Sequence, residues 1–204
     1  MIRYVNDDRG ERVEYEVDPR HAELIIAQLA SQRAKSVTRL EVKLKAEEAI
    51  AVSRDLIADL AKLYRSVTMR GQYMSADRSD LQYVTKERAR FMKKPTERDL
   101  VALRRMSRYL LKGLRLVQLF WRQSEPKKIV TFTDADHAGC PITRQSTMCI
   151  AVMSGLHSIR MSSDTIKDLC LSVGETEYFG TVKCGACAIG ARSIYEELEI
   201  RTNK

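Results

Sequence analysis

The sequence predicts an α+β protein in two parts: an N-terminal hairpin with a mostly helical region, followed by antiparallel strands and one long helix. Three observations predict this order. The first residues alternate around a turn-like DDRG, helical periodicity dominates from about residue 47 to residue 112, and four strand-like stretches follow Gly113. With 44% hydrophobic and 30% charged residues, the 204-residue chain has the composition of a globular protein.

At the N-terminus, residues 2–5 and 12–17 are expected to form two short strands on either side of the DDRG turn. Asp18 is expected to cap a helix that Pro19 opens, because proline is favoured in the first turn. The buried face of this helix is expected to carry three apolar residues: Leu24, Ile25 and Leu29. Residues 31–45 show weak periodicity and are interpreted as a connecting segment.

The helical region, from about Glu47 to Lys112, is expected to hold three or four helices, with breaks near residues 71–79 and at Pro95. The last of these helices has a clear start. Thr96 lies three residues before Asp99, which is a capping-box arrangement with Asp in place of the usual Glu. Its buried stripe is expected to consist of Leu100, Leu103, Met106 and Leu110.

The strand-like stretches are LRLVQLFW, KKIVTFT, RQSTMCIAVM and LHSIRMSS, separated by turn-forming residues. The third is expected to pair with the fourth as a hairpin through the turn at Ser154 and Gly155. Ser172 and Glu175 then form a second capping box, which predicts a final helix running to about Leu198.

The change of pattern after Gly113 divides the chain into a region 1–113 and a region 114–204. No apolar run approaches the roughly 18 residues of a membrane span, and the charged start is unlike a signal peptide. We therefore expect an intracellular chain, cytoplasmic or nuclear, with no membrane partner. The five cysteines are an odd number, which favours reduced thiols over a disulfide framework.

Positive charge is concentrated in one segment. Between Lys86 and Lys128 there are 14 Lys or Arg residues and 4 Asp or Glu residues, whereas the whole chain has a net charge of +8. This favours a polyanionic partner, and solvated helix faces are an equally good interpretation from charge alone. The candidate nucleic-acid-binding residues are Arg98, Arg104, Arg105, Arg108, Lys112, Lys127 and Lys128.

Two carboxylates end the strand-like stretch TFTDADHAGC. If this stretch is extended, Asp134 and Asp136 share one face, and a helix packed across the sheet could bring Glu177 near Asp134. Carboxylates that converge in this way suit Mg²⁺, and two such ions can hydrolyse phosphodiesters. From spacing alone, acids that cap helices or improve solubility are the more common interpretation.

Several motifs resemble those of copia-type LTR-retrotransposon polyproteins, in the family's order and over nearly the whole chain. TFTDADHAGCPITRQST resembles the opening of the family's RNase H domain, whose pattern is close to TDSDWAGCxxTRKSTSG. LSVGETEYFGTVKCGACAIGAR is similar to the family's LSSGEAEYYALVKGA helix, and VDPRHAELI to its ADPRHAEI. The stretch from LYRSVTMRGQYM to RRMSRYLLKG is similar to the family's YRxLVGxLxYLA and ALKRxxRYLKG segments.

The resemblance implies the end of a reverse transcriptase and its connection region, followed by an incomplete RNase H-like domain. In the family, four carboxylates hold two Mg²⁺ ions that cut the RNA strand of an RNA–DNA hybrid. Asp134 matches the first carboxylate and Glu177 the second, and Asp136 is the neighbouring acid and a further candidate ligand. The implied partners are an RNA–DNA hybrid and the rest of the polyprotein.

The chain also departs from the family. The third family Asp follows the final helix, and the sequence ends at Lys204, so two of the four ligands are expected to be absent and hydrolysis by the chain alone negligible. The IVTFT strand would then be an exposed edge. The alternative is a non-catalytic retrotransposon remnant that acts at most as a binding or interaction module. His137 stands where the family has Trp, which indicates packing.

Two other motifs are similar to metal-binding or redox motifs. YVNDD, residues 4–8, is similar to a polymerase metal-binding turn but has one residue too many, so it is interpreted as a hairpin turn. Cys184 and Cys187 form a CGAC motif, for which packing is favoured over a zinc or redox role because no second ligand pair has matching spacing.

Overall fold

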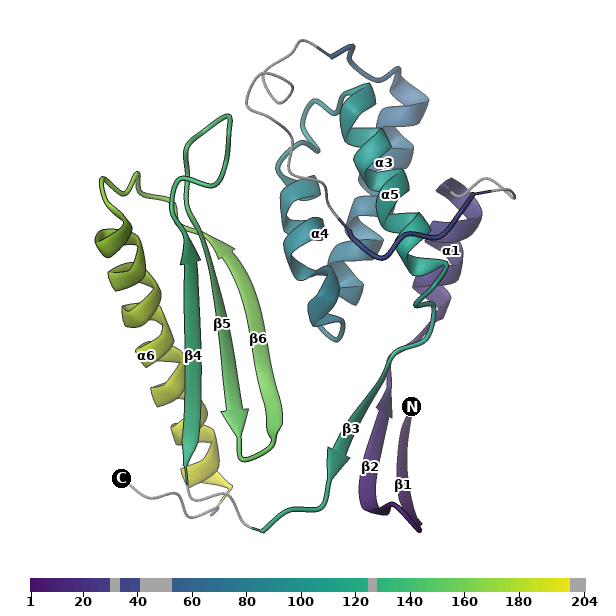
Figure 1. Cartoon of the computed structure of the whole chain (residues 1–204). Helices are drawn as coiled ribbons and strands as arrows, with labels where there is room; N and C mark the ends of the chain where they lie inside the picture. The colour runs from purple at the N-terminus through teal and green to yellow at the C-terminus, as the bar shows by residue number, and fades with distance from the viewer. Residues whose placement is uncertain (30–33, 41–52, 125–127, 199–204) are drawn as a thin grey trace. The chain divides into compact units, whose positions relative to one another are not determined.

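The computed structural model describes residues 1–29, 34–40, 53–124 and 128–198, and these confirm the predicted α+β class (Figure 1). The strands are β1 (Ile2–Asp7), β2 (Gly10–Glu16), β3 (Val117–Trp121), β4 (Ile129–Asp136), β5 (Thr147–Ser154) and β6 (His157–Thr165). The helices are α1 (Arg20–Leu29), α3 (Ala58–Met74), η1 (Ser79–Leu81), α4 (Gln82–Ala89), α5 (Glu97–Leu110) and α6 (Val173–Glu197).

The chain forms two compact units. The first consists of Met1–Arg3 and Glu14–Gln118, and the second of Tyr4–Val13 and Leu119–Lys204. The strands form two three-stranded sheets, in the orders β1-β2-β3 and β4-β5-β6. Although β3 lies in the sequence region expected to follow the helices, it pairs with β2 of the N-terminal hairpin. Of the helices that the structure describes, none combines the length and apolar character that crossing a bilayer requires.

The predicted cap of helix α1 is confirmed. The predicted buried face of this helix is wrong at one position, Leu24. The backbone N–H of Arg20 donates to Asp18 Oδ1 at 3.0 Å. The buried residues of the helix are Ala22, Ile25 and Leu29, whereas Leu24 is 42% exposed. At 100° per residue, Leu24 lies 200° around the helix from Ala22, so it points away from the core.

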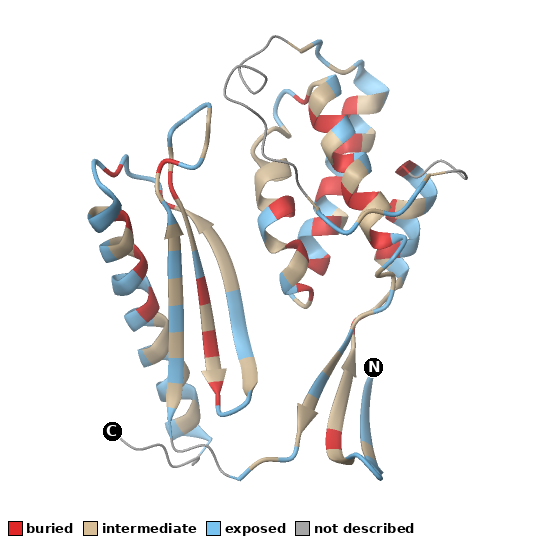
Figure 2. Cartoon of the chain, viewed as in Figure 1, coloured by how far each residue is buried: buried red, intermediate tan, exposed pale blue. Residues whose placement is uncertain are grey.

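The core of the first unit lies where α1, α3, α4 and α5 pack together (Figure 2). The predicted capping box of α5 is confirmed, since Asp99 Oδ2 accepts from the backbone and the hydroxyl of Thr96. The predicted stripe of α5 is also confirmed, because all four of its residues are buried: Leu100, Leu103, Met106 and Leu110. The part of the helical region at residues 41–52 lies outside the described residues.

The predicted break near residues 71–79 is confirmed, because α3 ends at Met74 and η1 begins at Ser79, while α3 continues through Gly71. A Cβ built at Gly71 would lie 2.9 Å from Thr85 Cγ2 and 3.3 Å from Met106 Cε. Glycine is therefore required there by the close approach of α4 and α5 to α3, and it does not mark a helix end.

The second sheet is antiparallel throughout, with Thr133 opposite Ile150 and Asp134 opposite Cys149. The predicted hairpin between β5 and β6 is confirmed, and Gly155 in its turn has a φ of +57°, a value that favours glycine. In the sheet as described, β4 has β5 as its one neighbour, so it is an edge strand, as expected for IVTFT. α6 packs against β4 and β5.

The YVNDD stretch forms the end of a hairpin, as predicted. Asp7 accepts hydrogen bonds from both terminal nitrogens of Arg12, at 2.8 and 2.9 Å, and from the backbone N–H of Arg9 at 2.9 Å. The Arg12 guanidinium also lies 5.0 Å from the centre of the Trp121 ring. These donors, Arg12 first, lower the pKa of Asp7 from 3.8 to about 2.

The first prediction concerns the packing of α6 on β4. A Cβ added at Gly180 would lie 2.9 Å from Thr133 Oγ1, whereas one added at Gly185 on the same helix meets nothing within 4 Å. We expect Gly180→Ala to destabilise the chain by about 1–3 kcal/mol through overpacking. The control Gly185→Ala should stabilise it by up to about 1 kcal/mol through helix propensity. Urea unfolding measures both, and equal stabilities would contradict this packing.

The second prediction concerns pH. Because the folded-state pKa of Asp7 is depressed, the stability that its carboxylate contributes is fully present above pH 3.8 and is lost as the pH falls towards about 2. The difference in unfolding free energy between the wild type and Asp7→Asn should therefore shrink over that range. In an Arg12→Gln background the difference should be smaller at every pH. A difference that stays constant from pH 5 to pH 2 would disprove the role of the ion pair.

Candidate functional site

The two predicted acids of β4 lie on its exposed face. Asp134 and Asp136 are exposed and alternate with half-buried neighbours along the strand. The face towards α6 is marked by Thr133, whose hydroxyl lies against Gly180 of the helix. Because successive side chains of a strand point to opposite faces, Asp134 lies on the face that α6 does not cover.

The Asp136 carboxylate folds over the loop that follows β4. A Cβ built at Gly139 would collide with Asp136 Oδ2 and Cγ. The side chain at the end of the strand is therefore turned towards its own backbone, and glycine at 139 leaves the space that this conformation needs.

Glu177 is half-buried in the second turn of α6, five residues after the cap residue Ser172, whose hydroxyl accepts from the backbone N–H of Glu175 at 3.1 Å. The adjacent Thr176 is buried, and its hydroxyl lies 2.8 Å from His137 Nδ1. This bond links the first turns of α6 to the residue after β4. It therefore places Glu177 at the same end of the sheet as the two acids of β4.

The His137–Thr176 bond was not foreseen from the sequence, which indicated only packing for His137. The same threonine also lies 3.5 Å from the Ser146 hydroxyl, and that hydroxyl accepts from the backbone N–H of Ala138 at 2.9 Å. A buried polar group needs such partners, so this cluster fixes the junction of β4, β5 and α6.

The three acids do not form a complete metal site. Among the described residues, no group of three or more His, Cys, Asp or Glu side chains is placed to hold a metal ion together. Oxygen ligands at Asp134 and Glu177 suit the chemistry of Mg²⁺, but a two-metal site needs more carboxylates than this part of the chain brings together.

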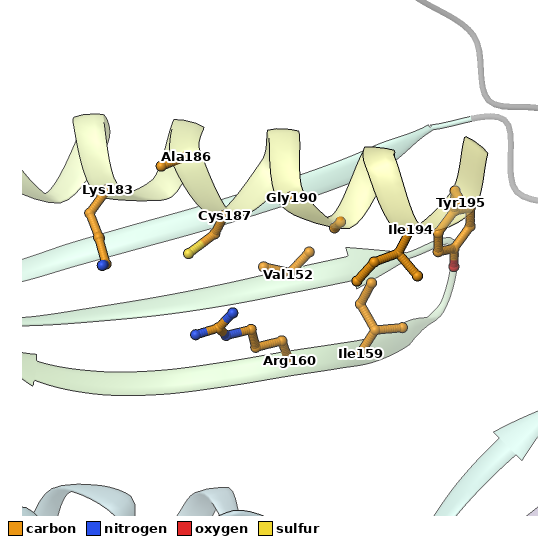
Figure 3. A pocket seen from close by; sticks show the side chains of 10 residues that line it. Val152, Ile159, Arg160, Lys183, Ala186, Cys187, Gly190, Ile194 and Tyr195 are labelled. Atoms are coloured by element: carbon orange, nitrogen blue, oxygen red, sulfur yellow. The ribbon is translucent and has the colours of Figure 1, made fainter. Parts of the chain in front are cut away.

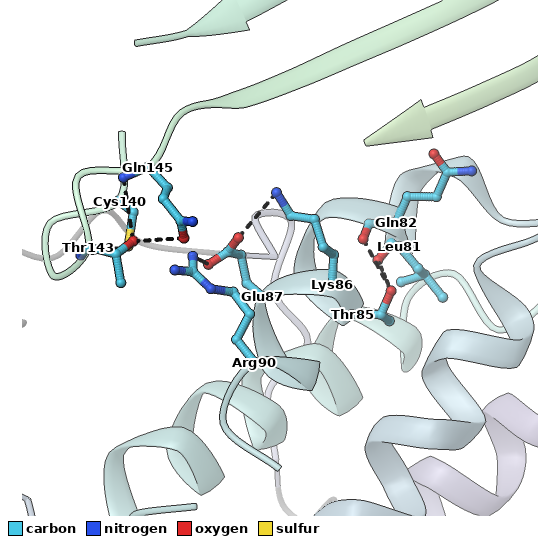
Figure 4. A network of polar contacts seen from close by, with 9 residues as sticks. All are labelled: Leu81, Gln82, Thr85, Lys86, Glu87, Arg90, Cys140, Thr143 and Gln145. Carbon is cyan, nitrogen blue, oxygen red and sulfur yellow. Dashed lines mark hydrogen bonds and ion pairs between the residues drawn. The ribbon is translucent and has the colours of Figure 1, made fainter. Parts of the chain in front are cut away.

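Two basic residues at the end of α4 share one carboxylate. Glu87 pairs with Lys86 at 3.2 Å and with Arg90 at 2.9 Å (Figure 4). Thr85 in the same helix turns its hydroxyl to the carbonyls of Leu81 and Gln82. One carboxylate balances only one of these two positive charges, so the end of α4 keeps a net positive charge.

On α5, the candidate arginines differ in their surroundings. Arg104 is exposed, whereas Arg105 and Arg108 are half-buried and donate from Nε to backbone carbonyls, those of Arg39 at 3.0 Å and Lys35 at 2.7 Å. A carbonyl is neutral, so both guanidinium charges remain uncompensated by these bonds. Of the other candidates, Arg98 is half-buried, Lys112 and Lys128 are exposed, and Lys127 lies outside the described residues.

The CGAC cysteines lie on the face of α6 that packs on the sheet. Cys184 is buried with Ile150 and Val152, and Cys187 is half-buried beside them. Cys187 also lines a pocket of about 420 Å³ next to α6, where Lys183 and Arg160 reach into the same end (Figure 3). Their positions match the packing role favoured from the sequence.

His157 is the first residue of β6, beside the turn between β5 and β6. Its Nε2 lies 2.7 Å from the carbonyl oxygen of Trp121, and its ring is 5.5 Å from that of Phe120. This histidine therefore ties the β5–β6 turn to β3, which is a structural role.

Comparison with known proteins finds relatives in Arabidopsis thaliana. The retrovirus-related Pol polyprotein from transposon RE1 is 31% identical over 141 residues, which are 69% of this chain and 10% of the polyprotein. The corresponding polyprotein from transposon RE2 is 32% identical over 115 residues, 56% of this chain and 8% of its own. An uncharacterized mitochondrial protein is 31% identical over 115 residues, which are 56% of this chain and 48% of that protein.

The chain thus spans about half of the mitochondrial relative and a tenth or less of the two polyproteins. No protein-family model matches the sequence. No solved structure matches it either.

Proposed function

Because this chain is related over about two thirds of its length to retrotransposon Pol polyproteins, as its motifs indicated, we propose that it binds nucleic acid as part of such a polyprotein. In this proposal, the helical unit corresponds to the end of the reverse transcriptase and its connection region. The unit with β4, β5, β6 and α6 corresponds to the beginning of the RNase H region. The other parts of the polyprotein are its natural partners.

The observation that carries the proposal is the charge of α5. From Leu100 to Lys112 the sequence contains four cations and no acid. Arg104 and Lys112 are exposed, and the bonds of Arg105 and Arg108 leave their charges unneutralised. Such a surface attracts the phosphate backbone regardless of base sequence, and its affinity falls steeply with salt.

A second candidate function is a contribution to the cleavage of RNA in RNA–DNA hybrids. It is supported by the exposed acids of β4 and by the bond between Thr176 and His137, which brings the first turns of α6 to the same end of the sheet. In this role, Asp134 and Glu177 would each supply an oxygen ligand to Mg²⁺ at the same end of the sheet, Asp134 from the face that α6 does not cover, and Mg²⁺ would supply charge stabilisation at the phosphate. The alternative is a binding module without catalysis.

Binding is tested by fluorescence anisotropy with a labelled RNA–DNA hybrid, measured over a range of salt concentrations. Replacing the exposed cation of α5 and the one just after the helix, in Arg104→Gln/Lys112→Gln, should reduce the slope of log affinity against log salt by about 1.8, or roughly 0.9 per phosphate contact. The control Arg54→Gln/Lys62→Gln removes two exposed cations of the same unit that lie outside the basic segment, and it should leave the slope unchanged. Failure of the wild type to bind would overturn the proposal.

Catalysis is tested with the same hybrid in Mg²⁺ or Mn²⁺. We expect no turnover by the chain alone, because the described residues bring no three potential ligands together. Metal-dependent cleavage that disappears in Asp134→Asn but persists in Asp164→Asn would show instead that the chain completes an active site.

A further inference from the structure

The segment 34–40 lies along α5 and is fixed there at both ends (Figure 1). Arg108 Nε donates to the carbonyl of Lys35 at 2.7 Å, and Arg105 Nε donates to the carbonyl of Arg39 at 3.0 Å. Between them, the backbone N–H of Val37 donates to the carbonyl of Arg108 at 3.3 Å. Leu40, the last residue of the segment, packs against the hydrophobic core and adds an apolar contact to these hydrogen bonds.

The backbone carbonyls that accept from Arg105 and Arg108 belong to the two cationic residues of segment 34–40. Lys35 and Arg39 are themselves exposed. Their side chains are therefore free to face solvent while their backbone is held against the arginines of α5. The segment 34–40, AKSVTRL, contains no acid, and neither does α5 after Asp99. Two stretches of chain more than 60 residues apart thus form one cationic surface without an internal carboxylate.

We propose that segment 34–40 is the second half of the phosphate-binding surface, with Lys35 and Arg39 as phosphate contacts. Arg105 and Arg108 are positioning residues that hold this segment on α5. Each guanidinium has five N–H donors and uses Nε for the carbonyl, so this bond leaves its charge in place. This inference rests on the proposed nucleic-acid function and adds residues that lie outside the basic segment of the sequence.

The shape of the surface favours a nucleic-acid backbone. On α5, Arg104 and Arg108 are four residues apart, about 6 Å along the axis at 1.5 Å per residue, and Lys112 lies two residues beyond the end of the helix. A duplex strand carries one charge per 3.4 Å of its axis, so the spacing of these two arginines corresponds to roughly two successive phosphates. Segment 34–40 adds Lys35 and Arg39 beside the cations of α5, so more than one phosphate of the same backbone can be bound.

The test compares Lys35→Gln/Arg39→Gln with the wild type in the hybrid-binding assay. We expect the salt slope to fall by about 1.8 and the affinity near 0.15 M salt to fall by roughly 30-fold, at about 0.9 per lost phosphate contact. The charge-matched control Arg54→Gln/Lys62→Gln should bind like the wild type. An unchanged slope in Lys35→Gln/Arg39→Gln, together with a reduced slope in Arg104→Gln/Lys112→Gln, would overturn this inference and leave the proposed function standing.

A second variant separates position from charge. Arg105→Lys/Arg108→Lys keeps every charge and removes both Nε donors, so we expect it to lose the part of the slope that Lys35 and Arg39 provide. A wild-type slope in this variant would overturn the positioning role. Competition by poly-glutamate at equal charge concentration should be weak, and competition as strong as that of the hybrid would assign the surface to acidic proteins instead.

Discussion

The buried guanidinium of Arg78 is the constraint on which the helical unit depends. The residue is 2% exposed and binds Asp80 through two nitrogens, at 2.6 and 3.2 Å, and the carbonyl of Gly113 at 2.5 Å. A buried charge that loses its partner costs about 3–5 kcal/mol, so the chain must keep both partners in place. The connection between α3 and α4 is thereby tied to the residue at which the chain leaves α5.

The same network fixes the direction of α5. Tyr109, in its last turn, donates its hydroxyl to Asp80 Oδ2 at 2.9 Å, and burial followed by this bond raises the pKa of the tyrosine. With its N-terminus fixed by the capping box at Thr96 and its C-terminus by Arg78, the helix has one orientation. The buried stripe then faces the core, and the cations between the stripe residues face segment 34–40 and solvent. The proposed phosphate surface is thus a consequence of how α5 is held.

In the other unit, close packing of one helix on the sheet decides which side chains are available for chemistry. Gly180 brings α6 against Thr133, so the odd-numbered residues of β4 face the helix and Asp134 faces away from it. The bond between Thr176 and His137 fixes the start of α6 at the end of β4. The packing at Gly180 and the bond at Thr176 together fix the position of Glu177 on the sheet. Neither contact shows that Glu177 binds a metal ion.

The sequence by itself determined the α+β class, the starts of α5 and α6, the strands β4 to β6 and the turn at Gly155. These features depend on residues within a few positions of one another, so local patterns predict them. Only the tertiary structure decided that Leu24 is exposed, that Gly71 lies inside a helix, and that Arg105 and Arg108 hold Lys35 and Arg39. Each of these depends on which elements pack together across tens of residues, and no local pattern carries that information.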